Sequence, residues 1–258
     1  MNLYLKFFSM HLKGQMQYKF SFFLTLFGQF IGAFSSYLAL YFMMTRFHKV
    51  ADYTFNEVII VFATMMFSYS IAECFMRGFD QFEKIIANGE FDRMLIRPKN
   101  IIFQIMTSKI DFSRLGKLIQ AIIILAYAIP TSEIIWTADK ITTLLLMIAG
   151  GTIIFSGIYI IYASLCFYTL EGLEFINIFT NGALEFGKYP ISIYGKTMVK
   201  IFTYFIPYTL FQYYPFLYLV GRSQNSLYAI LPIGTVFFLI PCYLLWKIGL
   251  KHYTSTGS

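Results

Sequence analysis

Two long runs without charge constrain this chain most strongly. Residues 20–45 and 141–170 contain no Asp, Glu, Lys, Arg or His. A helix needs about 20 apolar residues to cross a bilayer, so each run is long enough to cross with some tilt. The whole chain of 258 residues is 58% hydrophobic and only 13% charged, about half the charge content of a soluble domain. The sequence therefore predicts an all-α polytopic membrane protein.

Hydropathy along the chain predicts one transmembrane domain that covers residues 1–258. Residues 1–19 have apolar positions at helical spacing with lysines between and after them, which is typical of an amphipathic helix lying in the membrane interface. Spans are then expected near residues 20–45, 57–76, 110–130, 141–170 and 226–246.

The stretch 171–225 allows two topologies. In the first, residues 201–220 form a plain fifth span, although this run carries Pro207 and Pro215. In the second, residues 172–187 cross as a short helix and residues 190–220 fold back as a re-entrant hairpin from the outer side. Irregular backbone at membrane depth is tolerated where protein surrounds it. Both topologies give six transmembrane helices, with the two ends of the chain on one side.

Basic residues set the orientation of the chain. Thirteen of the 20 Lys and Arg residues lie on one predicted face, in residues 1–19, in residues 77–117 and after the last span. Cytosolic loops carry the excess of Lys and Arg, so we expect both ends and residues 77–117, here called the polar island, to be cytosolic. The expected location is the cell (inner) membrane. The positive charge lies in the loops between spans, where it orients the chain in the membrane. We therefore expect the chain to contact the lipid bilayer and to bind no nucleic acid.

The polar island contains a compact, mixed-charge segment. Apolar residues recur at helical spacing over 78–87, which predicts a short amphipathic helix. Asn88 and Gly89 should end it, because these residue types accept a left-handed backbone. A further turn or two should end at Arg97, since Pro98 disfavours helical geometry there. One interpretation is a solvated loop that only sets topology; the other is a docking element for a soluble partner.

Two acidic residues are candidate functional groups inside the membrane. Glu73 lies near the cytosolic end of the second predicted span, and a carboxylate in such a place is a functional candidate by default. The simpler alternative is an interfacial carboxylate or a partner for Arg77 one turn on. Glu185 becomes the second candidate if residues 172–187 cross the membrane.

No pattern in the sequence indicates covalent chemistry. The three histidines fall in different loops or tails and the three cysteines are widely separated, so neither a metal site nor a disulfide framework is indicated. Gly195 to Thr197 resembles part of a nucleotide-binding loop, but the glycine needed five residues earlier is Pro190. We expect no catalytic, cofactor-binding or metal-binding residues, and hence no enzyme.

Four segments carry a resemblance to a known family. They are GlnMetGlnTyrLysPhe at 15–20, GlyGluPheAspArgMetLeuIleArgPro at 89–98, TyrProIleSerIleTyrGly at 189–195 and IleProTyrThrLeuPheGlnTyrTyrPro at 206–215. Their order and spacing resemble the ABC-2 type permeases, in particular the branch with a Gly-Glu-hydrophobic-Asp-Arg-x-Leu-x-Arg-Pro signature after the second span. The likeness covers nearly the whole chain.

The resemblance implies the transmembrane subunit of an ATP-binding cassette exporter, forming half of the substrate path. It implies that residues 78–98, here called the coupling segment, seat in a groove of a separate ATPase subunit that binds and hydrolyses ATP. It also implies two ATPase copies, a second permease that is identical or related, and the hairpin at 190–220. The residues that take the coupling role by this likeness are Gly89, Glu90, Asp92, Arg93, Arg97 and Pro98.

The main alternative is a secondary transporter driven by an ion gradient. Such proteins usually contain inverted repeats and broken helices with polar groups at mid-membrane. The sequence has no clear internal repeat and few charged residues within its predicted spans. The ATP-driven permease is therefore the preferred hypothesis.

Overall fold

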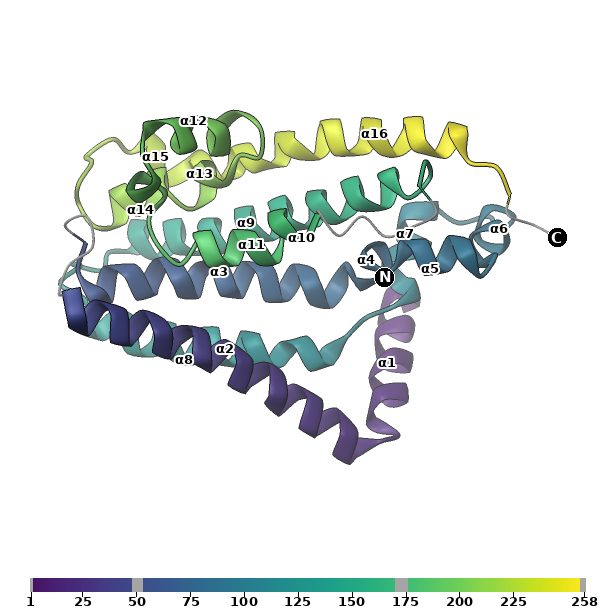
Figure 1. Cartoon of the computed structure of the whole chain (residues 1–258), viewed down its shortest axis with the longest axis horizontal. Coiled ribbons are helices and arrows are strands. Elements are labelled where there is room, and N and C mark those ends of the chain that lie inside the picture. The colour runs from purple at the N-terminus through teal and green to yellow at the C-terminus, as the bar shows by residue number, and fades with distance from the viewer. Residues whose placement is uncertain (1, 48–52, 170–175, 256–258) are drawn as a thin grey trace.

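A computed structural model describes residues 2–47, 53–169 and 176–255. Within these residues the regular elements are all helical, so the predicted all-α fold is confirmed. Figure 1 shows an elongated bundle whose long helices run roughly side by side, with a steeply inclined N-terminal helix at one end.

Among the described residues, five helical stretches are long and apolar enough to cross a membrane. The first two are α2 (Lys19–Phe47) and α3 (Phe55–Phe75), and the third joins η1 (Phe112–Arg114) to α8 (Leu115–Thr131). The fourth is α9 (Ala138–Leu165). The last is a continuous run of α15 (Leu227–Ile230), η3 (Leu231–Phe238) and α16 (Leu239–His252). These five correspond to the spans predicted near 20–45, 57–76, 110–130, 141–170 and 226–246.

Helix α3 lies at the centre of the bundle. It packs on both α8 and α9. In the most apolar 18-residue stretch of α3, 83% of the residues are buried, against 11% in that of α2. Its start is fixed locally, since Thr54 and Glu57 form a capping box in which the Thr54 backbone N–H donates to Glu57 Oε2 at 2.7 Å. The exposed apolar surface of α2 needs lipid or another protein chain to cover it.

Small residues let α9 approach its neighbours closely. A Cβ atom on Gly151 would lie 2.5 Å from Ser68 Oγ of α3, and one on Gly157 would lie 2.8 Å from the Phe238 ring. Close backbone approach at small residues is a common basis of helix packing in membranes. These glycines therefore serve contacts within the chain.

Residues 176–219 break into short elements. They are α10 (Ile176–Phe179), α11 (Asn181–Phe186), η2 (Ile191–Tyr194), α12 (Lys196–Tyr204), α13 (Tyr208–Phe211) and α14 (Tyr214–Leu219). Helix α11 packs on α3, whereas α13 and α14 pack on α9. Among the described residues none of these short helices is long enough to cross. Residues 172–175 of the proposed fifth crossing lie outside the described residues, so the sixth span and the re-entrant hairpin stay predictions.

The two ends of the bundle differ in what they carry. Helix α1 (Asn2–Met16) packs at the same end as the four short helices of the polar island, and both chain ends lie there (Figure 1). Helices α12 to α15 gather at the opposite end. The predicted placement of the polar island and both chain ends on one side agrees with this arrangement. Which side is cytosolic remains a prediction from the basic residues.

Candidate functional site

Residues 77–108 of the polar island fold as four short helices: α4 (Arg77–Asp80), α5 (Phe82–Ala87), α6 (Glu90–Leu95) and α7 (Ile101–Ser108). The single helix expected over 78–87 is interrupted at Gln81, because its two halves meet different partners. In α4, a Cβ on Gly78 would lie 1.9 Å from the backbone oxygen of Ile105 in α7. In α5, the Phe82 ring packs against Trp246 with 5.3 Å between ring centroids.

The predicted stop after α5 is present. Gly89 has φ of 64°, in the left-handed region that favours glycine. Its N–H donates to the Ile86 carbonyl at 2.9 Å, which closes the turn before α6 begins at Glu90. Helix α6 then ends at Leu95, just before Arg97, as the following proline predicts.

An aromatic cluster anchors α6 to the ends of two spans. The buried ring of Phe91 has centroids of three other rings within 5.5 Å, at 5.1 Å for Phe82, 5.5 Å for Phe167 and 4.8 Å for Tyr253. Trp246 of α16 contacts the same group. Edge-to-face ring pairs add stability beyond the area that they bury. The position of α6 is therefore tied to α16 and to the segment after α9.

The six residues assigned to coupling by family likeness lie in the turn at Gly89, in α6 and in the residues that follow it. The side chains of Arg93, Arg97 and Pro98 are exposed, whereas Gly89, Glu90 and Asp92 are partly buried. The structure thus separates an outward-facing group from an inward-facing one.

Asp92 faces the chain itself. Its carboxylate accepts hydrogen bonds from the Tyr253 hydroxyl at 2.9 Å and from the Ser255 hydroxyl at 2.7 Å. Tyr253 and Ser255 lie more than 160 positions after Asp92 in the sequence. Sequence reasoning missed these two partners because no local pattern signals such a contact.

Two apolar side chains complete the outward-facing group. Ile96 is 83% exposed and Leu95 is 39% exposed, and both lie between Arg93 and Arg97 in the sequence. The adjoining backbone is fixed from α7, where the Gln104 amide donates to the carbonyls of Met94 and Lys99, each at 3.0 Å. Sequence reasoning also missed this apolar contribution, although the pattern Arg-x-Leu-Ile-Arg at 93–97 places two apolar residues between two cations.

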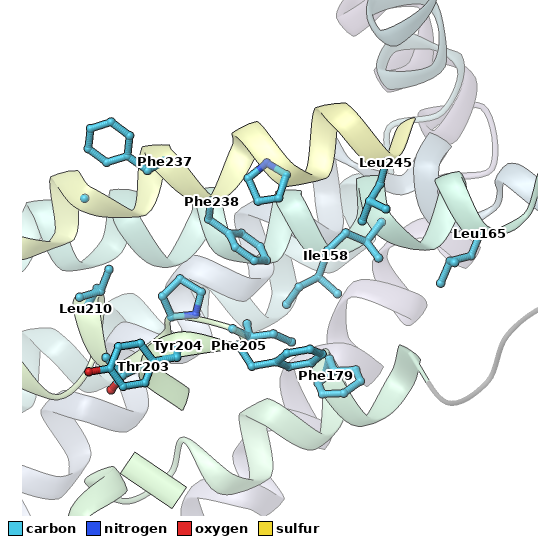
Figure 2. A pocket seen from close by; sticks show the side chains of 15 residues that line it. Ile158, Leu165, Phe179, Thr203, Tyr204, Phe205, Leu210, Phe237, Phe238 and Leu245 are labelled. Atoms are coloured by element: carbon cyan, nitrogen blue, oxygen red, sulfur yellow. The ribbon is translucent and has the colours of Figure 1, made fainter. Parts of the chain in front are cut away.

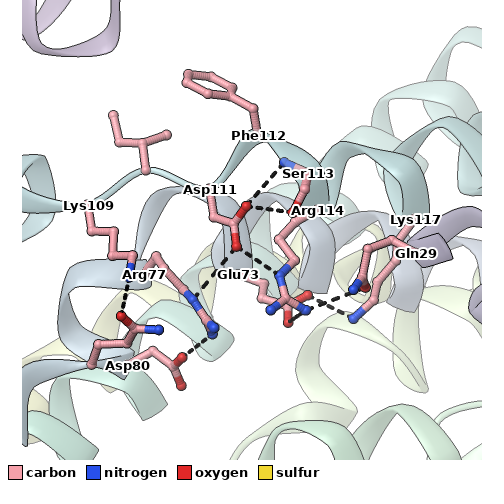
Figure 3. Close-up of polar contacts among 12 residues, drawn as sticks. Gln29, Glu73, Arg77, Asp80, Lys109, Asp111, Phe112, Ser113, Arg114 and Lys117 are labelled. Carbon is pink, nitrogen blue, oxygen red and sulfur yellow. Dashed lines mark hydrogen bonds and ion pairs between the residues drawn. The ribbon is translucent and has the colours of Figure 1, made fainter. Parts of the chain in front are cut away.

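A second polar feature lies where the polar island meets the spans (Figure 3). The buried carboxylate of Glu73 pairs with Arg114 at 2.8 Å and with Lys117 at 2.9 Å. The alternative partner expected from sequence, Arg77, pairs instead with Asp80 and, at 3.8 Å, with Asp111. The reason is tertiary: η1 and the start of α8 pack on α3 and bring Arg114 and Lys117 to Glu73.

The network extends beyond Glu73 to other helices. Arg114 Nε lies 3.2 Å from Asp111 Oδ2, and its Nη1 donates to Gln29 Oε1 of α2 at 3.4 Å. Helix α1 joins through Gln15, whose side chain accepts from the Phe112 N–H at 3.0 Å. A connected set of polar contacts thus links α1, α2, α3, α4 and α8.

The two aspartates of this network differ in pKa. At Asp111 burial acts to raise the pKa, but the hydrogen bond from Ser113 and the charge of Arg114 outweigh it and hold the pKa below its ordinary value. At Asp80 burial dominates and raises the pKa, although Arg77 opposes this shift. Asp111 is therefore the carboxylate that the fold stabilises in its charged form.

Glu185, the second candidate acid, lies in a different setting. Its side chain is 64% exposed and forms an ion pair with Lys188. Both residues line a cleft of about 360 Å³ between α2, α3 and α11, and Lys117 reaches the same cleft. Glu73 and Glu185 thus belong to neighbouring polar regions, because Lys117 pairs with the first and lines a cleft with the second.

An apolar cavity of about 590 Å³ lies between α9, the 203–210 segment and the last span (Figure 2). Its walls include Ile158, Leu165, Phe179, Phe205, Phe238 and Leu245. A volume of this size is within the range of ligand pockets. Its walls offer few polar groups, so it suits hydrocarbon rather than a charged ligand.

Comparison with known proteins identifies the family. A family model described as ABC-2 family transporter protein matches residues 30–257, which is nearly the whole chain. Searches of curated proteins and of solved structures found no match. The matched range includes the five long helices, apart from the first part of α2, and the entire polar island. The chain is therefore a multi-pass membrane component and a member of the ABC-2 family of transporter proteins.

Proposed function

We propose that this chain is the permease subunit of an ATP-binding cassette exporter and docks on a separate ATPase through the coupling segment. The observation that carries the proposal is the exposed tip of α6, with Arg93, Ile96 and Arg97, at the bundle end that also holds α1 and the polar island. Exposed apolar side chains flanked by Arg residues suit a protein contact site, where Arg is enriched and apolar side chains form the core.

The chemistry of the tip specifies the partner. Arg side chains pair with carboxylates through two parallel hydrogen bonds, and an apolar anchor such as Ile96 fills a pocket at the centre of an interface. The expected receptor is a groove on the ATPase with an apolar floor and acidic walls.

The packing of the coupling segment suits the transmission of force. Phe91 lies in the aromatic cluster with Phe167 and Trp246, so a displacement of α6 would carry α9 and α16 with it. Gly78 lies so close to Ile105 that α4 and α7 would move together. Closure of the ATPase pair would thus rotate packed helices as rigid bodies and open the path outward.

The proposed assembly contains two permeases, identical or related, and two ATPase subunits. One set of spans supplies half of a path, so the route would lie at the permease interface. ATP would be bound and hydrolysed on the ATPase, and no cofactor is required of this chain. The proposed location is the cell membrane, with the polar island and both chain ends in the cytosol, as the positive-inside rule predicts.

The test is affinity capture of the tagged chain in mild detergent from its own cells. The variant Arg93→Glu/Arg97→Glu reverses two exposed charges at the tip of α6. The matched control Lys196→Glu/Lys200→Glu reverses two exposed charges on α12, at the opposite end of the bundle. We expect wild type and control to bring down a soluble ATPase, and the α6 variant to lose it at least about tenfold, since like charges across an interface repel.

Two outcomes would overturn the proposal. If wild type recovers no ATPase, the ATP-driven permease loses its support and the ion-gradient-driven transporter becomes the preferred hypothesis. If the α6 variant and the α12 control lose the ATPase equally, docking does not depend on the coupling segment. Folding of each variant is checked by its elution as a single species in detergent, and its insertion by its recovery in the membrane fraction of the cells.

A further inference from the structure

The residues after the last span close back onto the coupling segment. Tyr253 and Ser255 follow the end of α16, and their hydroxyls donate to the two different carboxylate oxygens of Asp92 in α6. Asp92 is thus held on both oxygens by one short stretch of tail. Hydrogen bonds to a charged carboxylate are stronger than those between neutral groups.

Ring packing supports the same contact. The Tyr253 ring stands at 90° to the Phe91 ring with 4.8 Å between centroids, and it also contacts Phe167 at 5.8 Å. Tyr253 therefore contacts two successive residues of α6, one through its ring and one through its hydroxyl. Such a contact fixes both the position and the rotation of this short helix.

Among the described residues, helix α6 has few other contacts that fix both its position and its rotation. Six residues are too few for a helix to be stable by itself, and its opposite end is held from α7 through Gln104. The tail contact adds a hydrogen-bonded link from α6 to the final span, beside the packing of Phe91 on Trp246, because Tyr253 continues directly from α16.

We propose that Asp92, Tyr253 and Ser255 form an intramolecular latch that positions α6 and couples its displacement to α16. This role rests on the proposed function, since the displacement is the one that an ATPase would impose. Asp92 is then a positioning residue rather than a docking residue. The outward-facing Arg93 and Arg97 dock, while Asp92 passes the movement to the last span.

The latch differs from a simpler role for Asp92 in the charge balance of its helix. Asp92 and Glu90 both lie in the first turn of α6, where acidic groups stabilise a helix N-terminus. Substitution of Tyr253 and Ser255 removes the hydroxyls of the latch but leaves Glu90 and Asp92 in the first turn of α6. Only the latch role therefore predicts that this substitution loosens the helix. Glu90→Gln serves as the matched control for Asp92→Asn, since it removes one first-turn charge and leaves the latch intact.

The first measurement is amide hydrogen exchange on the purified permease alone. We expect the amides of residues 90–95 to exchange about tenfold faster in Tyr253→Phe/Ser255→Ala and in Asp92→Asn. Tyr253→Phe retains the ring and its packing. The controls Glu90→Gln and Tyr243→Phe, the latter ten residues earlier on α16, should exchange at the wild-type rate within about twofold.

The second measurement uses the complex captured from cells. We expect Tyr253→Phe/Ser255→Ala to retain the ATPase as wild type does, because the outward face of α6 is unchanged. ATP turnover per captured complex should fall by up to the same tenfold factor, since the latch reinforces the link that the rings of Phe91 and Trp246 make between α6 and α16. A purely structural role would lower capture and turnover together.

Unchanged exchange in both latch variants would overturn the latch itself. Faster exchange with unchanged turnover would overturn its role in transmission. If wild type captures no ATPase, the proposed function and the transmission role fall together. The exchange result then still decides whether the latch exists, so the two failures are distinguishable.

Discussion

Oε1 of Glu73 lies 2.8 Å from Nη1 of Arg114, which joins the end of α3 to the start of the next long span. The second oxygen of the same carboxylate pairs with Lys117 at 2.9 Å. A buried carboxylate that is paired on both oxygens is strongly coupled to its surroundings, because neither cation can leave without exposing an unpaired charge. This junction connects the polar island to the bundle.

Glu73→Gln should destabilise the protein by about 3 kcal/mol, because it leaves Lys117 partly buried without its counter-charge and Arg114 paired with Asp111 alone. The measurement is thermal or denaturant unfolding in detergent. Glu185→Gln is the matched control: its side chain is 64% exposed, and exposed pairs contribute about 0–1 kcal/mol. Equal effects of the two substitutions would contradict the account of Glu73 as a buried junction.

Phe91→Ala should destabilise the protein by about 3 to 5 kcal/mol, since it empties a site in the aromatic cluster. The loss should be accompanied by faster proteolysis within residues 82–95. Leu95→Ala, in the same helix but exposed, should change stability by about 0.5 kcal/mol or less. A small effect at Phe91 would mean that the cluster does not hold α6.

Gly89→Ala should cost about 1 kcal/mol through backbone strain alone, because φ is 64° and a Cβ there would meet no atom within 4 Å. Asn at this position should cost less, since Asn tolerates the left-handed region. Gly14→Ala in α1 also meets open space but has helical geometry, so it should be neutral or slightly stabilising. Unfolding midpoints of the three variants test this order.

Asp111 should make stability depend on pH in one direction. Because its folded pKa lies below the ordinary value of 3.8, its contribution is fully present above that value and is lost as pH falls through the folded pKa. Asp111→Asn should therefore lower stability by about 1 kcal/mol at pH 7. The difference from wild type should vanish in acid below the folded pKa. A difference that persists there would show that the aspartate acts through packing rather than through charge.

Sequence reasoning predicted the features that depend on local composition. The five long helices follow from apolar runs whose length is set by the bilayer, and the turn at Gly89 follows from the conformational freedom of that residue. Membership of the ABC-2 family, predicted from the likeness, was confirmed by the family match to residues 30–257. Residues 171–225 were ambiguous because prolines and charges interrupt the hydropathy signal, and the structure divides the described residues 176–219 into short helices.

Pairing between distant residues was decided only by tertiary structure. Arg77 was the nearest cation to Glu73 in sequence, yet the packing of η1 and α8 on α3 supplies Arg114 and Lys117 instead. Asp92 carried a docking role by family likeness, yet the end of α16 brings Tyr253 onto it from 161 positions away. A sequence determines which segments can enter a bilayer because transfer free energy is a local sum over side chains. It does not state which partners meet, since that depends on how whole helices pack.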